Sequence, residues 1–276
     1  MEHAYSIDEL KHLATEVRKD VLRSITAAGS GHPGGSLSAV DIMTALYFHT
    51  ANLTSPIDPN RDRIFWSKAH VAPLLYTLLA YKGFFPKEEL LTLRKLGSRL
   101  QGHPKKDSPP GVETSGGSLG QGLSIAVGAA YAARYDHSPV RAYCLNGDGE
   151  IQEGQIWEAL MAGAHFKLDN LCAIIDNNGL QIDGKCSDVM GIDDVAGKLR
   201  AFNWHVISID GHDMEQCVNA LEEAKTVKGR PTAIVAHTIK GKGVSFMENV
   251  VGWHGKAPSQ DELAQAIREL DAQEGE

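Results

Sequence analysis

Two stretches of sequence, VRAYCLNGDG at residues 140–149 and LCAIIDNNG at residues 171–179, decide the expected fold. Each begins with an apolar run of the length of a buried strand, residues 140–145 and 171–175, and ends in glycine and acidic or amide residues. Because parallel strands present their carboxyl ends at one edge of a sheet, Gly147-Asp148-Gly149 and Asn177-Asn178-Gly179 are expected to lie side by side. The sequence therefore places its most distinctive polar residues together.

These two turns offer the groups that a metal-bound phosphate requires. Asp148 supplies a charged oxygen and Asn178 a neutral one, and magnesium takes six oxygen ligands, some of them from substrate phosphates. The glycines allow close approach of an anion, and a helix expected to begin near Glu153 would direct its amides toward it. The same residue types dominate ordinary strand-to-helix turns, so this pair alone leaves both interpretations open.

Further strand-like and helical runs alternate along the chain. Besides the two central strands, apolar runs predict strands at residues 63–67, 205–209 and 232–236, with helical periodicity between them. This alternation predicts an α/β fold, with a mostly parallel sheet and helices on both faces. At 276 residues and 42% hydrophobic residues, the chain can form one large domain.

The N-terminal region is expected to be helical. Ser6 and Glu9 have the spacing of a capping box, and apolar residues recur on one face of a helix that ends at Gly29. A glycine-rich loop is expected at residues 30–36, followed by a helix that turns four residues inward, namely Ala39, Met43, Leu46 and Tyr47.

Four histidines stand in loops or at the ends of expected elements. His32 lies in the glycine-rich loop, His70 opens a helix, and His103 lies in a second Gly-His-Pro tripeptide. His254 follows residues 241–252, which we expect to form a mobile loop able to close over a ligand. A helix N-terminus lowers the pKa of a histidine and favours anions, but a solvated loop or a capping role would explain each histidine taken alone.

Residues 109–122 are too rich in glycine for a helix or strand without a further reason. Close approach of the backbone to a flat ligand would be such a reason. The segment leads into an alanine-rich and glycine-rich helix expected at residues 123–135, which suits a buried interface.

The composition argues against several classes of function. A net charge of −8 without a basic run disfavours nucleic acid as a partner. No apolar run is long enough to cross a bilayer, and residues 1–11 lack the apolar core of a secretory signal, so we expect a cytoplasmic chain without a membrane partner. The four cysteines lack metal-ligand or redox spacing and are expected to be reduced.

Taken together, the motifs resemble those of transketolases and follow the same order. They are Ser30-Gly31-His32-Pro33-Gly34, Trp66-Ser67-Lys68-Ala69-His70, Gly102-His103-Pro104, Leu119-Gly120-Gln121-Gly122, Gly147-Asp148-Gly149 with Glu153-Gly154, Asp176-Asn177-Asn178-Gly179 and His254-Gly255. The resemblance covers nearly the whole chain but only the N-terminal portion of the family. It implies a single diphosphate-binding domain at residues 1–276, without pyrimidine-binding and C-terminal domains, and hence the N-terminal subunit of a split transketolase.

The resemblance also implies cofactor ligands. Magnesium, or calcium or manganese in its place, would be held by Asp148, Asn178 and the carbonyl of Leu180. At the diphosphate end, thiamine diphosphate would be contacted by His70, Gly149, Asn178 and His254. Gly117 and Leu119 would lie near its aminopyrimidine end. Glu153 matches an interface carboxylate linked to the glutamate that activates the cofactor.

The implied reaction is transfer of a two-carbon ketol unit from a ketose, or ketose phosphate, to an aldose or aldose phosphate, as in the pentose phosphate pathway. His32, His103 and His254 would surround the substrate, and His32 and His254 are the candidates for moving the proton of the reacting hydroxyl. Acid and base roles reverse between the two halves of the reaction, so groups with a near-neutral pKa are expected.

Two departures from the family pattern affect the expected site and partners. Gly117-Ser118 stands where one-chain transketolases commonly have Gly-Pro. The half that would carry the activating glutamate, the aromatic bed for the pyrimidine and the sugar-phosphate ligands is missing, which implies a partner subunit and a heterotetramer.

Three alternatives stay open at this point. An E1 alpha subunit of a 2-oxoacid dehydrogenase shares the Gly-Asp-Gly and Asn pair but does not explain the loops of His32, His70 and His103. A fragment of 1-deoxyxylulose-phosphate synthase fails for the same reason. A thiamine-diphosphate-binding module without catalysis is the third alternative.

Overall fold

The computed structural model describes residues 5–192 and 194–273. Its centre is a five-stranded sheet in the order β1-β2-β3-β7-β6, and every neighbouring pair of strands is parallel. The strands are β1 (Arg63–Trp66), β2 (Ala142–Gly147), β3 (Leu171–Asn177), β6 (His205–Asp210) and β7 (Thr232–His237). The predicted α/β fold with a parallel sheet is confirmed.

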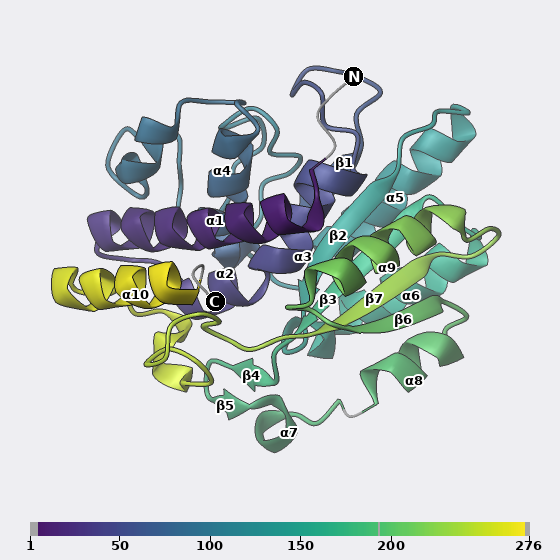
Figure 1. Cartoon of the computed structure of the whole chain (residues 1–276). Helices are drawn as coiled ribbons and strands as arrows, with labels where there is room; N and C mark the ends of the chain where they lie inside the picture. Colours follow the sequence, from purple (N-terminus) through teal and green to yellow (C-terminus); the bar gives the residue numbers. More distant parts are fainter. Residues whose placement is uncertain (1–4, 193, 274–276) are drawn as a thin grey trace.

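Helices cover both faces of this sheet (Figure 1). The helices on one side are α1 (Ile7–Ala28), α3 (Val40–Ala45), α4 (Ala72–Tyr81) and α9 (Met214–Thr226). Those on the other side are α5 (Gly122–Tyr135), α6 (Gly154–His165) and α8 (Val195–Ala201). The remaining α-helices and strands are α2 (Pro33–Ser38), α7 (Cys186–Val189), α10 (Gln260–Gln273), and the short strands β4 (Leu180–Gln181) and β5 (Gly184–Lys185), which pair as a hairpin. A π-helix spans Leu46–Thr50, and short 3₁₀ turns span Ala69–Val71, Lys87–Thr92, Glu150–Gln152 and Val251–His254. Helix α10 lies beside α1 at the margin of the molecule.

The strands supply side chains to two separate hydrophobic cores. In β2, Tyr143 and Leu145 belong to the core beneath α1, α3, α4 and α9, whereas Ala142 and Cys144 belong to the core beneath α5, α6 and α8. Side chains alternate between the two faces of a strand, and here both faces are buried, which is why the strands read as continuous apolar runs. The four cysteines are buried and free.

The N-terminal helix forms as its sequence predicts. Ser6 Oγ accepts the amide of Glu9 at 3.2 Å and Glu9 Oε2 accepts the amide of Ser6 at 2.8 Å, which completes the capping box. The helix ends at Gly29, whose φ of 63° is in the left-handed region.

The segment expected as a glycine-rich loop is largely helical. Helix α2 begins at Pro33, because proline suits the first turn of a helix, where its missing N–H would have no partner. Ser36 reinforces the turn, since its hydroxyl donates to the carbonyl of His32 at 2.7 Å. His32 is therefore fixed at the start of a helix.

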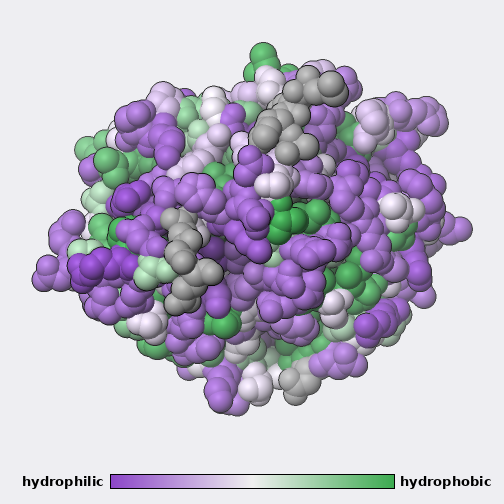
Figure 2. Space-filling model, viewed as in Figure 1, coloured by the Kyte–Doolittle hydropathy of each residue, from purple (hydrophilic) through white to green (hydrophobic). Residues whose placement is uncertain are grey.

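The surface is consistent with the composition. In the view of Figure 2 it is mostly hydrophilic, with apolar residues in small separate groups. Within the described residues, no helix combines the length and the apolar character needed to span a membrane.

Candidate functional site

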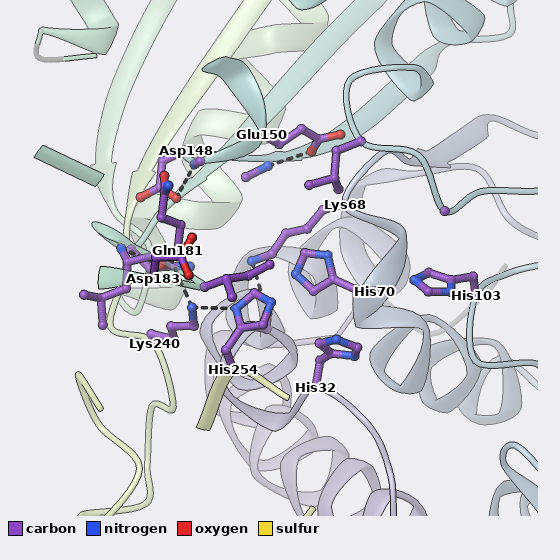
Figure 3. Close-up of a pocket in the computed structure, with 18 residues that line it drawn as sticks. His32, Lys68, His70, His103, Asp148, Glu150, Gln181, Asp183, Lys240 and His254 are labelled. Carbon is purple, nitrogen blue, oxygen red and sulfur yellow. Dashed lines mark hydrogen bonds between the residues drawn. The ribbon is translucent and has the colours of Figure 1, made fainter. Parts of the chain in front are cut away.

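A cavity of about 310 Å³ opens at the carboxyl ends of β1, β2 and β3 (Figure 3). All but one of the residues predicted from sequence to bind metal, cofactor or substrate line it, namely His32, His70, His103, Gly117, Leu119, Asp148, Gly149, Asn178, Leu180 and His254. The exception is Glu153. The topology thus brings together residues that are widely separated in the sequence.

Three oxygen donors lie along one wall of the cavity. Asp148 follows β2 directly and Asn178 follows β3 directly, so both sit at the sheet edge. The Asp148 carboxylate accepts the amide of Gly149 at 2.8 Å and also the amide of Gly179, which ties the two turns together. The carbonyl of Leu180 belongs to the same wall. One carboxylate with two neutral oxygens is a donor set suited to magnesium, and the described residues contain no cluster of three or more His, Cys, Asp or Glu that could hold a metal.

A buried ion pair supports this wall from below. Asp176 is fully buried and accepts hydrogen bonds from Lys68, from Thr238 and from the hydroxyl of Ser38 at 2.6 Å. Burial alone would raise the pKa of Asp176, but the Lys68 ammonium and these hydrogen bonds hold it below its ordinary value. The Asn178 amide nitrogen lies 3.4 Å from the Asp176 carboxylate, which leaves the amide oxygen turned away from the ion pair.

The four predicted histidines form one contiguous group in the cavity (Figure 3). The ring centroid of His32 lies 5.2 Å from that of His70, 5.4 Å from that of His254 and 6.5 Å from that of His103. The rings of His70 and His254 are 5.2 Å apart. Since the four residues come from separate segments, only the fold makes them a group.

Burial and nearby cations keep these imidazoles neutral. Burial, and then Arg94, lowers the pKa of His32 to about 4. The same two causes lower the pKa of His103. Burial, and then Lys240, lowers the pKa of His254 to about 3. These pKa values lie below the near-neutral values expected for reversible acid–base roles, and a bound anion would move each of them upward.

The pKa of His70 is lowered, as its position predicts, but for a different reason. It lies in a short turn, Ala69–Val71, ahead of α4 rather than in the first turn of that helix. Burial is the main cause of the shift, and the Lys68 ammonium is the next.

A second lysine reaches the same wall from the segment after β7. The buried Lys240 donates to Nδ1 of His254 at 2.9 Å and to the carbonyl oxygen of Leu180 at 3.2 Å. Burial, and then the neighbouring Lys68, lowers its pKa to about 8. The cavity thus concentrates positive charge beside the oxygen donors, as a site for a bound anion would.

The segment expected to be a mobile lid is packed into the protein. Val244 and Met247 are fully buried, and the amide of Gly241 donates to the carbonyl of Gly34 at 2.9 Å. His254 already lines the cavity, so closure of residues 241–252 is not needed to bring it there.

Glu153 does not line the cavity, unlike the other residues expected to bind the cofactor. A short turn, Glu150–Gln152, follows the Gly147-Asp148-Gly149 stretch and carries the chain past the cavity before α6 begins. Glu153 therefore stands exposed at the N-cap of α6. The acidic residue of this stretch that lines the cavity is Glu150.

Lys68, Lys240, Glu150 and Asp183 are the charged residues of the cavity lining to which sequence reasoning assigned no role. Lys68 stands two residues before His70, and Glu150 stands two residues after Asp148. Their closeness to predicted site residues is the sequence feature that could have identified them. Lys240 had a weaker signal, because lysine beside glycine after a strand is common in surface turns.

Comparison with known proteins agrees with this arrangement. The family model described as "Transketolase, thiamine diphosphate binding domain" matches residues 10–274. The 6-deoxy-6-sulfo-D-fructose transketolase subunit SqwG of Clostridium sp. is 43% identical over 265 residues, which cover 95% of this chain and 96% of that protein. One of the subunits of the apulose-4-phosphate transketolase of Phocaeicola vulgatus is 40% identical over 96% of this chain and 94% of its own length.

The fold also matches solved structures. The crystal structure of the Campylobacter jejuni transketolase superposes with a TM-score of 0.89 at 34% identity and covers 95% of this chain. This chain covers only 42% of that longer protein.

Proposed function

The chain belongs to the transketolase family through its thiamine diphosphate binding domain, and we propose that it is the N-terminal subunit of a two-chain transketolase. In this proposal residues 1–276 form the diphosphate-binding domain, and a second chain supplies the pyrimidine-binding half. The enzyme would transfer a two-carbon ketol unit from a ketose, or ketose phosphate, to an aldose or aldose phosphate.

The observation that carries this proposal is the charge arrangement of the cavity. Lys68 and Lys240 bring two ammonium groups to a wall that also presents the oxygens of Asp148, Asn178 and Leu180. Lys68 is paired with Asp176, whereas Lys240 forms no salt bridge among the described residues, and burial, and then Lys68, lowers its pKa to about 8. A diphosphate bound with a divalent cation would give Lys240 an anionic partner and would bring the metal that the oxygen donors suit.

The residues that would hold the cofactor follow from this fit. Asp148, Asn178 and the Leu180 carbonyl would bind magnesium, or calcium or manganese in its place, and His70, Gly149 and His254 would face the diphosphate. Gly117 and Leu119, at the other end of the cavity wall, would face the aminopyrimidine. When bound, thiamine diphosphate supplies the electron sink that makes cleavage of the carbon–carbon bond feasible.

The histidines would bind and orient the sugar and move its proton. His32 is the best placed for this, because its ring lies among those of His70, His254 and His103 in the lining of the cavity. His254 lies beside His32, and His103 lies on its other side, so the three would surround the hydroxyl groups of the substrate.

Exposed surfaces beside the cavity support the proposed partner. Residues 115–118 are exposed, and Glu153 stands on the same rim, where it would meet the partner rather than the cofactor. On α5 and α6, Ile125, Tyr131 and Met161 are 42%, 47% and 55% exposed, so these two helices offer apolar side chains to a partner. A heterotetramer with two copies of each chain would cover these surfaces.

The substrate is proposed only as a class. The two subunit relatives are named for different ketoses, one a sulfonate and one a phosphate. Both names describe a sugar with an anionic tail, and we extend that feature to this chain. An E1 alpha function, a synthase fragment or a module without catalysis is less well supported, because the cavity contains the full set of four histidines.

Reconstitution tests the proposal. The purified chain is mixed with a candidate pyrimidine-binding subunit, and turnover of a ketose phosphate with an aldose phosphate is measured with and without magnesium and thiamine diphosphate. We expect weak cofactor binding and no ketol transfer by the chain alone, and magnesium-dependent transfer by the mixture. Steady transfer by this chain, shown by mass spectrometry to be free of any partner, would refute the two-chain proposal, and decarboxylation of a 2-oxoacid instead would favour the E1 alpha function.

A further inference from the structure

Glu150 joins three segments that are remote from one another in the sequence. Its Oε1 accepts the hydroxyl of Ser67 at 2.5 Å and the amide of Gly120 at 2.8 Å, and its Oε2 accepts the amide of Gly147 at 3.0 Å. Ser67 Oγ in turn accepts the amide of Gly122 at 3.0 Å. The carboxylate is buried, so the whole network is shielded from water.

Each of these segments carries a different part of the cavity wall. Ser67 directly precedes Lys68, and Gly147 directly precedes Asp148, so both belong to the diphosphate end. Gly120 follows Leu119, which belongs with Gly117 to the opposite end. One carboxylate thus spans the two ends of the proposed cofactor site.

This attachment is one of two that hold the loop containing Gly117. Residues 115–118 are exposed; on one side the amide of Gly116 donates to the carbonyl of Pro104 at 3.0 Å, and on the other side Gly120 and Gly122 are held through Glu150 and Ser67. A Cβ atom on Gly122 would lie 2.5 Å from Cβ of Ser67, so the loop approaches β1 as closely as glycine allows. The hydrogen bonds to Glu150 and Ser67 set the distance between this part of the loop and the end of β1.

Glu150 differs from a carboxylate buried to form an ion pair. Within the described residues no salt bridge within 4.0 Å involves it, and its three partners are a hydroxyl and two amides. Two carboxylate oxygens can accept all three donors, whereas a neutral glutamine has one acceptor oxygen and would turn its amide nitrogen toward another donor. The network therefore requires the carboxylate rather than only the shape of the side chain.

We propose that Glu150 is a positioning residue that sets the Gly117–Leu119 loop at a fixed distance from the diphosphate end, so that the site binds thiamine diphosphate as a whole rather than its diphosphate alone. This inference rests on the proposed function. It assigns to Glu150 a role in selecting the cofactor, without contact with the reacting atoms.

The test compares two ligands that share the diphosphate. The full-length chain, with its partner subunit where cofactor binding requires it, is titrated calorimetrically with thiamine diphosphate and with inorganic pyrophosphate, both with magnesium. In Glu150→Gln the affinity for thiamine diphosphate should fall by about tenfold, the effect of one lost hydrogen bond to a charged group, while that for pyrophosphate changes less than about twofold. Ser67→Ala, which keeps the carboxylate and removes one donor, should shift the ratio of the two affinities in the same direction.

Asp62 provides the matched control. It is also a buried carboxylate, and it accepts the amides of Asn52 and Arg141 at 2.9 Å each, but it lies at the opposite edge of the sheet, just before β1. Asp62→Asn should reduce thermal stability and leave the ratio of the two affinities unchanged.

The outcomes separate this inference from the proposed function. A wild-type protein that does not bind thiamine diphosphate would overturn the proposed function. If the wild type binds thiamine diphosphate, three results would overturn only the role of Glu150. They are equal losses of affinity for both ligands in Glu150→Gln, no loss of affinity in that variant, and the same change in the affinity ratio in Asp62→Asn. If Glu150→Gln fails to fold, Ser67→Ala decides by the same two titrations, supported by faster hydrogen exchange at Gly120 and Gly122.

Discussion

Nζ of Lys240 lies 2.9 Å from Nδ1 of His254. Because an ammonium group can only donate, Nδ1 of His254 must accept, and the neutral ring carries its proton on Nε2. The tautomer of a proposed substrate histidine is thus set by a lysine from the segment after β7. The same ammonium also contacts the Leu180 carbonyl at 3.2 Å, so one lysine links a histidine to a proposed metal ligand.

Replacing Lys240 by methionine should raise the pKa of His254. Burial is the larger cause of its depression to about 3 and Lys240 is the next, so the pKa should rise in the variant but stay below its ordinary value. An NMR titration of the ring measures the change. Lys242→Met is the control, because Lys242 lies outside the cavity and faces Glu248 at 3.8 Å, and an unchanged pKa in Lys240→Met would contradict the assignment.

Replacing Asp148 by asparagine should separate metal binding from folding. Burial, and then the nearby Asp176, raises the pKa of Asp148, so removing the charge should offset the loss of one of the two amide hydrogen bonds, and the variant should stay folded. Magnesium-dependent binding of thiamine diphosphate should be lost, because no other charged ligand is assigned. Calorimetry and thermal melting measure the two effects, with the exposed Asp188→Asn as control, and wild-type affinity in Asp148→Asn would remove this residue from the metal site.

The histidines should divide into two classes in the reconstituted enzyme. His32→Ala and His103→Ala should keep cofactor affinity and lose turnover by about a hundredfold, the usual contribution of an acid–base group. His70→Ala should weaken cofactor binding as well. Steady-state kinetics and calorimetry on the three variants measure turnover and cofactor affinity, with His237→Ala as a control outside this cavity. Small and equal effects in all three variants would show that the histidines only fill space.

A buried charge network away from the cavity should make folding sensitive to acid. Asp41 accepts from Arg18 at 2.9 Å and from His212 at 2.8 Å, and although burial alone would raise its pKa, these partners lower it to about 2. The ionised carboxylate therefore contributes stability above its unfolded pKa of about 4, and this contribution is lost as the pH falls from about 4 to about 2.

Asp41→Asn should cost about 3 to 5 kcal/mol at neutral pH, because it leaves a buried guanidinium without its partner. Urea unfolding of the wild type and the variant over a pH series measures this difference, which should narrow toward acid pH. A difference that stays constant down to the lowest pH would show that Asp41 does not titrate as described.

Several features could be predicted from the sequence because they depend on neighbours along the chain or on the pattern of apolar residues. The capping box of Ser6 and Glu9 involves groups three residues apart, and the apolar runs of β2 and β3 reflect burial on both sheet faces. Because both runs are predicted to be parallel strands, Asp148 and Asn178 must share an edge of the sheet. The strand ends still differed from prediction by up to two residues, because pairing extends β2 and β3 to Gly147 and Asn177.

Other features were decided only by the tertiary structure, because they depend on which groups meet in a space that excludes water. The sequence alone determined the family motifs, the parallel strands and the polar turns at their ends. It did not indicate that Lys68 and Lys240 converge on the Asp148 wall, that the histidines are neutral, or that Glu150 rather than Glu153 faces the cavity. The physical reason is that a charge acquires its role from burial and from neighbours within a few ångströms, and here those neighbours come from segments that only the fold brings together.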